Sequence, residues 1–153
     1  MAKLEQIGKL NAVVTQNIDG LHQAAGSRHV CELHGSVYRN HCTKCRRSYS
    51  LEQIMAMKGV PTCECGGIIK PDVVLYGEGL DNSVVTDAIR SIREADTMIV
   101  GGTSLAVYPA AGLIDYFRGD TLIVINLSPT PRDREATLCV HEKIGEALSF
   151  VMD

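Results

Sequence analysis

Residues 12 to 20, AVVTQNIDG, decide the prediction of the fold, because a short apolar run passes directly into polar residues. The first four residues of this stretch are expected to form a buried strand. Residues 30 to 36, VCELHGS, repeat the pattern, and there an apolar run leads into His34. We therefore expect two successive buried strands that carry polar side chains to one edge of a sheet.

The rest of the chain alternates apolar runs with helical stripes. Near-continuous apolar strands between amphipathic helices favour an α/β fold with a parallel sheet that helices cover on both faces. In such folds ligands bind outside the carboxyl ends of the strands. Asp81, Asn82 or Ser83 can cap one helix, and Pro109 suits the first position of another. Strands are expected at residues 73–76, 98–100, 121–127 and 138–140, and helices near residues 4–10, 84–95, 109–119 and 145–152.

The composition indicates a folded globular protein. The 153 residues are 45% hydrophobic and 22% charged, close to the average for soluble proteins. The net charge of -3 argues against nucleic acid as a partner, because domains that neutralise phosphates carry a basic excess. No apolar run approaches the roughly 20 residues that span a bilayer, and the first residues lack an apolar secretion signal. We expect no membrane association and a cytoplasmic location.

Four cysteines form two close pairs in a segment that lacks hydrophobic periodicity. Two residues separate Cys42 from Cys45, and one residue separates Cys63 from Cys65. Thiolate pairs on tight turns suit tetrahedral zinc. Because cysteine fills all four positions, no place remains for a reactive water, and the metal is expected to be structural.

Two disulfides or free core thiols are the alternatives to zinc. The absence of a secretion signal weighs against disulfides. Gly66 and Gly67 follow the second pair and can relieve backbone strain there. Cys31 and Cys139 lie in apolar strands and are expected to be small core residues, while His41 is expected to be a bystander beside the cluster.

The polar residues at the two strand ends allow two interpretations. A histidine at a sheet edge can act as a general base near neutral pH, with Gln16, Asn17 and Asp19 around it. Alternatively these residues are structural, since a single histidine at a strand end often has no catalytic role and Asn-x-Asp-Gly is a plausible turn. The residues alone leave both interpretations open.

Residues 15–22, TQNIDGLH, and residues 32–36, ELHGS, together resemble the paired signature of the sirtuins, which are NAD-dependent protein deacylases. The order of the later motifs agrees with that family, and the pattern is most similar to its bacterial branch. After the cysteine pairs come PDVVLYGE at residues 71–78, GTSL at residues 102–105 and IN at residues 125–126.

The resemblance implies a Rossmann-like NAD-binding domain with an inserted zinc-ribbon module. The domain would comprise residues 1–38 and 68–153, and the module residues 39–67. Sirtuins begin with a glycine-alanine-glycine loop, and no such loop stands before residue 101 of this chain. The fold is therefore expected to be incomplete, with its first βα unit missing and the chain truncated.

The resemblance also implies the reaction and the residues that perform it. The acyl-lysine oxygen displaces nicotinamide from NAD, His34 deprotonates the ribose as general base, and the products are nicotinamide, free lysine and O-acyl-ADP-ribose. Asn17 and Asp19 are expected beside His34 as catalytic residues. The cofactor-binding residues implied are Gln16, Asn17, Ile18, Asp19, Gly102, Thr103, Ser104, Asn126 and Ile144.

A substrate protein or peptide carrying an acyl-lysine is the partner that the resemblance implies. The peptide would lie as an added strand in a cleft, which explains weak sequence preference. The valines of this set could also be core residues. The residues implied for the cleft are Val73, Val74, Gly77, Glu78 and Val107.

Two other functions stay open beside deacylation. The chain could be a catalytically inactive, zinc-stabilised fragment that binds peptides or a partner, or it could transfer ADP-ribose to protein. His34 favours deacylation. The motifs do not specify which acyl group is removed.

Overall fold

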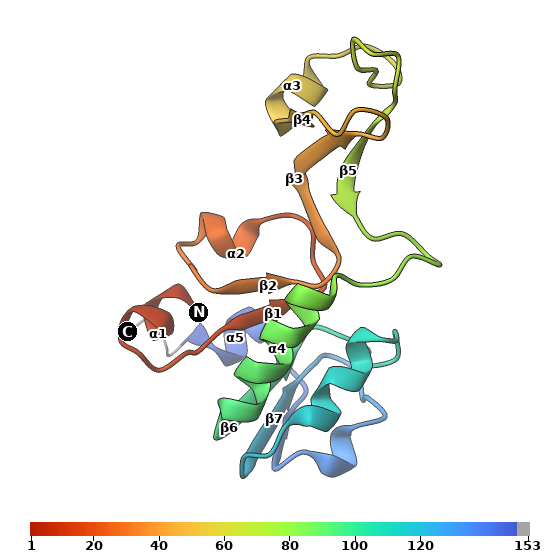
Figure 1. Cartoon of the computed structure of the whole chain (residues 1–153). Coiled ribbons are helices and arrows are strands. Elements are labelled where there is room, and N and C mark those ends of the chain that lie inside the picture. The colour runs from red at the N-terminus through yellow and green to blue at the C-terminus, as the bar shows by residue number, and fades with distance from the viewer. Residues whose placement is uncertain (150–153) are drawn as a thin grey trace.

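The computed structural model describes residues 1–149. These residues form an α/β body and an arm that projects from it (Figure 1). The body holds two parallel sheets, and the arm is built on an antiparallel sheet. The predicted α/β architecture with parallel strands and a small inserted module is thereby confirmed.

The longest helix, α4, has thirteen residues and the longest strand, β3, has eight, and most of the other elements are short. In chain order they are α1 (Ala2–Gln6), β1 (Val13–Thr15), α2 (Leu21–Ala24), β2 (Val30–Glu32), β3 (Gly35–Cys42), β4 (Ser48–Tyr49), α3 (Leu51–Met55), β5 (Ile69–Val73), α4 (Asn82–Glu94), β6 (Thr97–Gly101), η1 (Ala110–Tyr116), β7 (Thr121–Ile125), η2 (Asp133–Glu135), β8 (Leu138–Val140) and α5 (Ile144–Ala147).

Strands β1 and β2 form the first parallel sheet, with Val14 opposite Cys31. Both strands are apolar and short, and Val13 and Cys31 are buried. Parallel strands end at the same edge of their sheet. The residues that follow β1 and β2, including Gln16 and His34, therefore emerge at one edge, as the sequence predicts.

Strands β6, β7 and β8 form the second parallel sheet, with β7 in the middle. Val124 of β7 lies opposite Val100 of β6 and Cys139 of β8. Only 1% of Val124 is exposed. A β-branched residue covered on both faces is typical of a central parallel strand.

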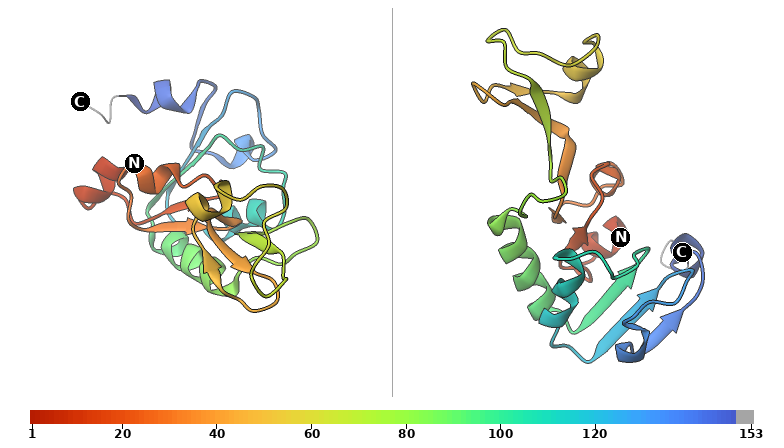
Figure 2. Two further views of the ribbon diagram at one scale, coloured as in Figure 1. Left: turned by 90° about the horizontal axis from the view of Figure 1, so that it is seen from above. Right: turned by 90° about the vertical axis from the view of Figure 1, so that its right-hand side faces the viewer.

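Helix α4 joins the two parallel sheets through a shared core. Its buried Ala88 and Ile92 pack with Leu33, which follows β2, and with Leu113 of η1, while Met98 of β6 packs against the same cluster. In the side view of Figure 2, α4 and η1 lie on the same side of the strands. Within residues 1–149 no strand of one parallel sheet pairs with a strand of the other, so side-chain packing makes this connection.

The amino end of α4 is capped by Asp81. Its Oδ1 accepts hydrogen bonds from the backbone N–H groups of Ser83 at 2.8 Å and Val84 at 3.3 Å. These bonds satisfy donors that have no partner inside the helix, which contributes about 1 kcal/mol. Of the three caps that the sequence allows, Asp81 is the one used.

The arm consists of β3, β4, α3 and β5. Strand β3 pairs antiparallel with β4 on one side and with β5 on the other. Helix α3 begins with a capping box in which Ser50 and Gln53 bond each other's backbone N–H groups. Figures 1 and 2 show β3 and β5 running side by side away from the body.

The prediction of a strand at residues 73–76 is wrong. Strand β5 ends at Val73 and belongs to the antiparallel arm, not to a parallel sheet. The following residues are apolar but exposed, since 55% of Leu75 and all of Tyr76 are accessible. An apolar run cannot by itself distinguish a buried strand from an exposed apolar segment.

The helix predicted near residues 109–119 is the 3₁₀ helix η1. Pro109 is the residue before η1, so it does not take the first helical position. The N–H of Gly112 donates to the carbonyl of Pro109 at 3.1 Å, three residues back. A glycine inside the segment weakens α-helical propensity, which accounts for the tighter and shorter helix.

The terminal helices are shorter than predicted. Helix α1 ends at Gln6, before the predicted limit at residue 10, and α5 covers Ile144–Ala147. Residues 150–152 of the last predicted helix lie outside the described residues. Among residues 1–149, no helix has the length and apolar content needed to cross a membrane.

Replacement of Gly35 by alanine is expected to destabilise the chain by about 2 kcal/mol or more. Gly35 has φ +77°, and a Cβ there would stand 1.7 Å from the Asp72 carbonyl oxygen of the paired strand. Urea unfolding of the full chain measures the change. Gly79→Ala is the matched control, because a Cβ at position 79 meets nothing within 4 Å. Equal stability of the two variants would contradict the close approach of β3 and β5.

Candidate active site and metal centre

The ends of the two parallel sheets are joined by one side-chain hydrogen bond. Gln16 Nε2, after β1, donates to Thr103 Oγ1, after β6, at 3.5 Å. The contact is partly buried and links residues 87 positions apart. The sequence placed both residues in a cofactor site, and the structure brings this pair together.

His34 is oriented by the backbone at the end of β1. Its Nδ1 lies 3.0 Å from the Gln16 carbonyl oxygen. A carbonyl oxygen can only accept, so Nδ1 carries the hydrogen, and in the neutral ring Nε2 keeps the lone pair. The His34 carbonyl also accepts the N–H of Val74 at 3.1 Å. The half-buried imidazole is therefore held in a tautomer that can accept a proton at Nε2.

Residues 17–20 form a turn, as one of the two interpretations of the sequence proposes. The N–H of Asn17 donates to Thr15 Oγ1 at 3.1 Å, and Asp19 Oδ1 accepts the N–H of Leu21 at 3.0 Å. Gly20 has φ +66° and lies so close to the Tyr38 ring that a Cβ would stand 2.8 Å from Cε2. The turn fixes Ile18 and Asp19 while leaving Asn17 exposed, so a structural role and a binding role are compatible here.

The carboxyl ends of β6, β7 and β8 bring part of the remaining cofactor set together. The Gly102 N–H donates to the Ile125 carbonyl at 3.1 Å, and Asn126 Nδ2 donates to the Ser128 carbonyl at 2.8 Å. Ile144 packs against Gly101, where a Cβ would stand 2.2 Å from Ile144 Cδ1. These contacts line one edge of the second sheet.

Thr103 and Ser104 lie in the loop that follows β6. No helix starts directly after them, since η1 begins only at Ala110 and residues 102–109 form a loop. The attraction of an anion to a helix start therefore does not apply to this turn. What the loop offers is the Thr103 hydroxyl, which also accepts the Leu105 N–H at 3.3 Å, and the exposed Ser104.

The segment after β5 is folded back by Glu78. Its Oε2 accepts the N–H of Leu75 at 2.8 Å and lies 3.5 Å from Lys70 Nζ. The Leu75 N–H, and then the Lys70 ammonium, hold the pKa of the Glu78 carboxyl below its usual range. Gly77 supplies the positive φ of the turn. No pattern in the sequence predicts the contact between Glu78 and Lys70.

The predicted cleft residues are more exposed than core residues would be. Val73 and Val74 are half-buried, and 47% of Val107 is accessible. Tyr76 is a further exposed apolar side chain here, which the sequence pattern misassigned to a strand. The structure brings Val74 to His34 by a backbone hydrogen bond, whereas no contact described for residues 1–149 joins Val107 to the 73–78 segment.

The four cysteines of the arm gather as predicted. Their sulfur atoms all lie within 4.8 Å of one another, with Cys42 and Cys65 3.5 Å apart and Cys45 and Cys63 3.6 Å apart. Tetrahedral zinc with bonds of about 2.3 Å places sulfurs about 3.8 Å apart, whereas a disulfide needs about 2.05 Å. The cluster fits a structural zinc ion, and the disulfide alternative does not describe it.

The surroundings of the cluster favour thiolates at Cys42 and Cys63. Backbone N–H groups of Lys44 and Cys45 point to Cys42 Sγ at 3.4 and 3.5 Å. The Tyr49 hydroxyl donates to Cys63 Sγ at 3.0 Å. This bond, and after it the backbone N–H of Cys65, lower the pKa of the Cys63 thiol to about 6. Gly67 is required sterically, because a Cβ there would stand 2.6 Å from Cys42 Sγ.

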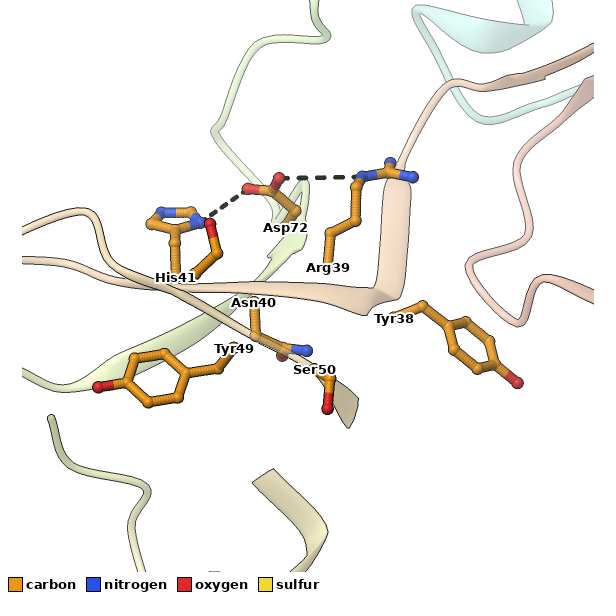
Figure 3. A pocket seen from close by; sticks show the side chains of 8 residues that line it. Tyr38, Arg39, Asn40, His41, Tyr49, Ser50 and Asp72 are labelled. Atoms are coloured by element: carbon orange, nitrogen blue, oxygen red, sulfur yellow. Dashed lines mark ion pairs between the residues drawn. The ribbon is translucent and has the colours of Figure 1, made fainter. Parts of the chain in front are cut away.

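A hollow of about 360 Å³ lies on the arm and not at the strand ends (Figure 3). His41 and Arg39 both face Asp72 on its wall, with His41 Nδ1 2.9 Å and Arg39 Nε 3.9 Å from the carboxylate. His41 thus ties β3 to β5 beside the cysteine cluster. The hollow contains none of the predicted catalytic or cofactor residues, so we place the candidate site at the strand ends, where the oriented base lies.

Comparison with known proteins identifies close relatives. The model of the Sir2 family matches residues 1–109. The chain is 59% identical over 155 residues to an NAD-dependent protein deacetylase of Clostridium perfringens, and 57% identical over 154 residues to one of Clostridium acetobutylicum. These matches cover 100% and 99% of this chain but 64% and 63% of the relatives. The chain therefore spans slightly less than two thirds of their length.

Solved structures that superpose on this chain are also described as Sir2 proteins. The structure of Sir2Tm bound to a propionylated peptide superposes with a TM-score of 0.92 at 43% identity, covering 99% of this chain and 66% of that one. The structure described as Sir2-p53 peptide-NAD+ superposes with a TM-score of 0.89 at 41% identity, covering 99% and 65%. Body and arm thus have counterparts in experimental structures.

Replacement of Cys45 by serine is expected to lower the bound zinc by one ion per chain, because serine cannot supply the fourth thiolate. Metal analysis of the purified full chain measures the loss. Cys139→Ser is the control, since Cys139 lies in β8 and bonds the Asp133 carbonyl. Unchanged zinc in Cys45→Ser would contradict the assignment of the cluster.

Tyr49→Phe is expected to shift acid-induced zinc release to higher pH. Removal of the hydroxyl donor raises the pKa of Cys63, and protons then compete with zinc for the thiolate at a higher pH. A colorimetric zinc indicator follows release during acid titration. Tyr38→Phe, on the same arm but half-exposed, should leave the midpoint unchanged. A shift to lower pH in Tyr49→Phe would contradict the role of this hydrogen bond.

Proposed function

The chain belongs to the Sir2 family, and we propose that it supplies the general base and part of the NAD and peptide sites of an NAD-dependent protein-lysine deacylase. Its curated relatives carry the name NAD-dependent protein deacetylase. The chain spans 63–64% of their length, so the activity, the cofactor and the substrate are assigned to it by this proposal.

The observation that carries the proposal is the orientation of His34. Its Nδ1–H is committed to the Gln16 carbonyl at 3.0 Å, which leaves Nε2 to accept a proton. The Gln16 side chain reaches in turn to Thr103, so the base and the cofactor residues form one connected group. A preset tautomer is what a general base requires.

In the proposed reaction, NAD would provide the carbon that the acyl-lysine oxygen attacks, and it would then accept the acyl group. His34 takes a proton from the ribose at Nε2. Asn17 and Asp19 follow Gln16, whose carbonyl holds His34. One carboxylate oxygen of Asp19 is held by the Leu21 N–H, and the Asn17 side chain is exposed. We propose that the turn at residues 17–20 lines the nicotinamide pocket.

The other NAD contacts are proposed along the edges of both parallel sheets. Gln16 and Ile18 follow β1, and Gly102, Thr103 and Ser104 follow β6. Asn126 follows β7, and Ile144 packs on Gly101 at the same edge. Positions at the carboxyl ends of parallel strands support a ligand role, because ligands of open α/β sheets lie there.

The proposed substrate is a peptide that carries an acyl-lysine and lies as an added strand. The solved relatives include Sir2 bound to acetylated peptide and Sir2Tm bound to a propionylated peptide. In this chain Val73, Val74, Gly77 and Glu78 form a folded segment bonded to the backbone of His34, and Val107 is exposed. Backbone pairing with such a segment would hold a peptide near the base.

The remaining parts of the proposal concern the arm and the location. We propose that residues 39–67 form a zinc module inserted into an NAD-binding domain made of residues 1–38 and 68–153, with the ion as a structural element. A cytoplasmic location is proposed with the activity, because NAD and acylated proteins occur together inside cells.

His34→Ala is expected to lower NAD-dependent deacetylation at least about 100-fold, as for loss of a general base. The assay uses an acetyl-lysine peptide with the chain alone and with the chain joined to the part of the C. perfringens relative that the match does not cover. His22→Ala, on α2, is the control and should keep activity.

Each outcome of this assay has a distinct meaning. Activity that depends on NAD and on His34 supports deacylation, in either form of the protein. Peptide binding without NAD consumption in both forms would favour the binding function, and transfer of ADP-ribose to protein would favour the transferase. Full activity in His34→Ala would contradict the role given to this base.

A further inference from the structure

A second group of metal-ligating side chains lies at the other end of β2 from His34. His29 directly precedes β2, Cys31 lies within it, and Asp87 comes from α4. His29 Nε2 is 2.8 Å from Asp87 Oδ2, Cys31 Sγ is 3.4 Å from the same oxygen, and the sulfur and the nitrogen are 4.0 Å apart. Three different donor atoms thus converge on one point, and the group shares no residue with the arm cluster.

The distances between these donors suit one ion. Tetrahedral zinc binds nitrogen and oxygen at about 2.0–2.2 Å and sulfur at about 2.3 Å, which separates the ligand atoms by roughly 3.3–3.6 Å. The observed 2.8, 3.4 and 4.0 Å bracket that range. Shifts of about half an ångström, within the reach of side-chain rotation, would seat the ion.

His29 is preset for coordination by its second nitrogen. Nδ1 lies 2.7 Å from the Asn11 carbonyl oxygen and donates a hydrogen bond to it. Without an ion, Nε2 also donates, to Asp87 Oδ2 at 2.8 Å, and a bound ion would replace that proton at Nε2. Metal-binding histidines commonly donate their other N–H in this way. Glu5 also fixes the backbone, because its carboxylate accepts the N–H groups of Arg28 at 2.8 Å and His29 at 2.7 Å.

The arrangement does not suit a catalytic cysteine. Only 4% of Cys31 is exposed, and the ring nitrogen that would take its proton is 4.0 Å away. In a catalytic triad the carboxylate orients the ring through the nitrogen opposite the one that takes the proton. Asp87 instead contacts Nε2, the same nitrogen that faces Cys31. The second oxygen of Asp87, Oδ1, is paired with Arg90, which leaves Oδ2 as the donor toward the cluster.

We propose that His29, Cys31 and Asp87 form a second metal site, which binds a divalent transition-metal ion of zinc type. The thiolate and the carboxylate neutralise the two positive charges of the ion. On binding, the Cys31 thiol proton and the proton that His29 Nε2 shares with Asp87 both leave to solvent. The His29 and Asp87 side chains are 40% and 32% exposed, so a water can complete the coordination. The ion ties β2 to α4, the helix on which the body core is built.

Metal stoichiometry of the full chain tests the site. After metal removal and reloading with zinc, the unsubstituted chain should bind two ions, one in each cluster. Asp87→Asn keeps the shape of the side chain but weakens the ligand, and it should lower the affinity of one ion at least about tenfold. His29→Gln should lower the affinity of one ion in the same way. Asp81→Asn is the matched control on the same helix, because asparagine also caps helices.

Cobalt provides an independent readout of the donor set. Cobalt bound to Cys31 should give a thiolate charge-transfer band in the Cys45→Ser background, where the arm cluster is incomplete, and Asp87→Asn should weaken it. The proposal is overturned if the unsubstituted chain binds a single zinc ion, or if Asp87→Asn and His29→Gln keep both ions with unchanged affinity. In either case His29, Cys31 and Asp87 bind no ion and only link β2 to α4 through hydrogen bonds. Neither outcome depends on deacylase activity.

Discussion

Burial of the apolar stripe of α4 is the interaction on which the body of the protein depends. Ala88 is fully buried and 5% of Ile92 is exposed, and both pack on residues from the two parallel sheets and from η1. Burial of a side chain such as Ile92 contributes about 2 kcal/mol. Since the sheets share no strand pairing within residues 1–149, this core sets where the ends of β1, β2 and β6 lie relative to one another.

The candidate site follows from that placement. Parallel strands deliver Gln16 and His34 to one edge, and the packing of β6 brings Thr103 to within 3.5 Å of Gln16 Nε2. Backbone carbonyls and N–H groups then fix the side chains, with the Gln16 carbonyl orienting His34. The arm is organised differently, around four sulfurs with the buried Ile69 and a few half-buried apolar side chains packed against them.

The sequence predicted features that depend on local chemistry. The alternation of apolar runs with polar ends placed Gln16 and His34 at one edge, and cysteine spacing identified the cluster of the arm. It could not predict features that depend on distant pairing. The antiparallel partner of β5, the bond between Gln16 and Thr103, and the meeting of His29 with Asp87 all depend on which segments pack together. Asp87 lies beside the apolar stripe of α4, and no local pattern marks it as a ligand.

The identity of the acyl-containing product is the measurement that tests the proposed function most directly. The chain joined to the uncovered part of the C. perfringens relative would be given NAD and a peptide whose acetyl-lysine carbonyl carries oxygen-18, and the products analysed by mass spectrometry. We predict nicotinamide and O-acetyl-ADP-ribose that retains the label, in equal amounts with free lysine peptide. Free acetate formed without consumption of NAD would contradict the account.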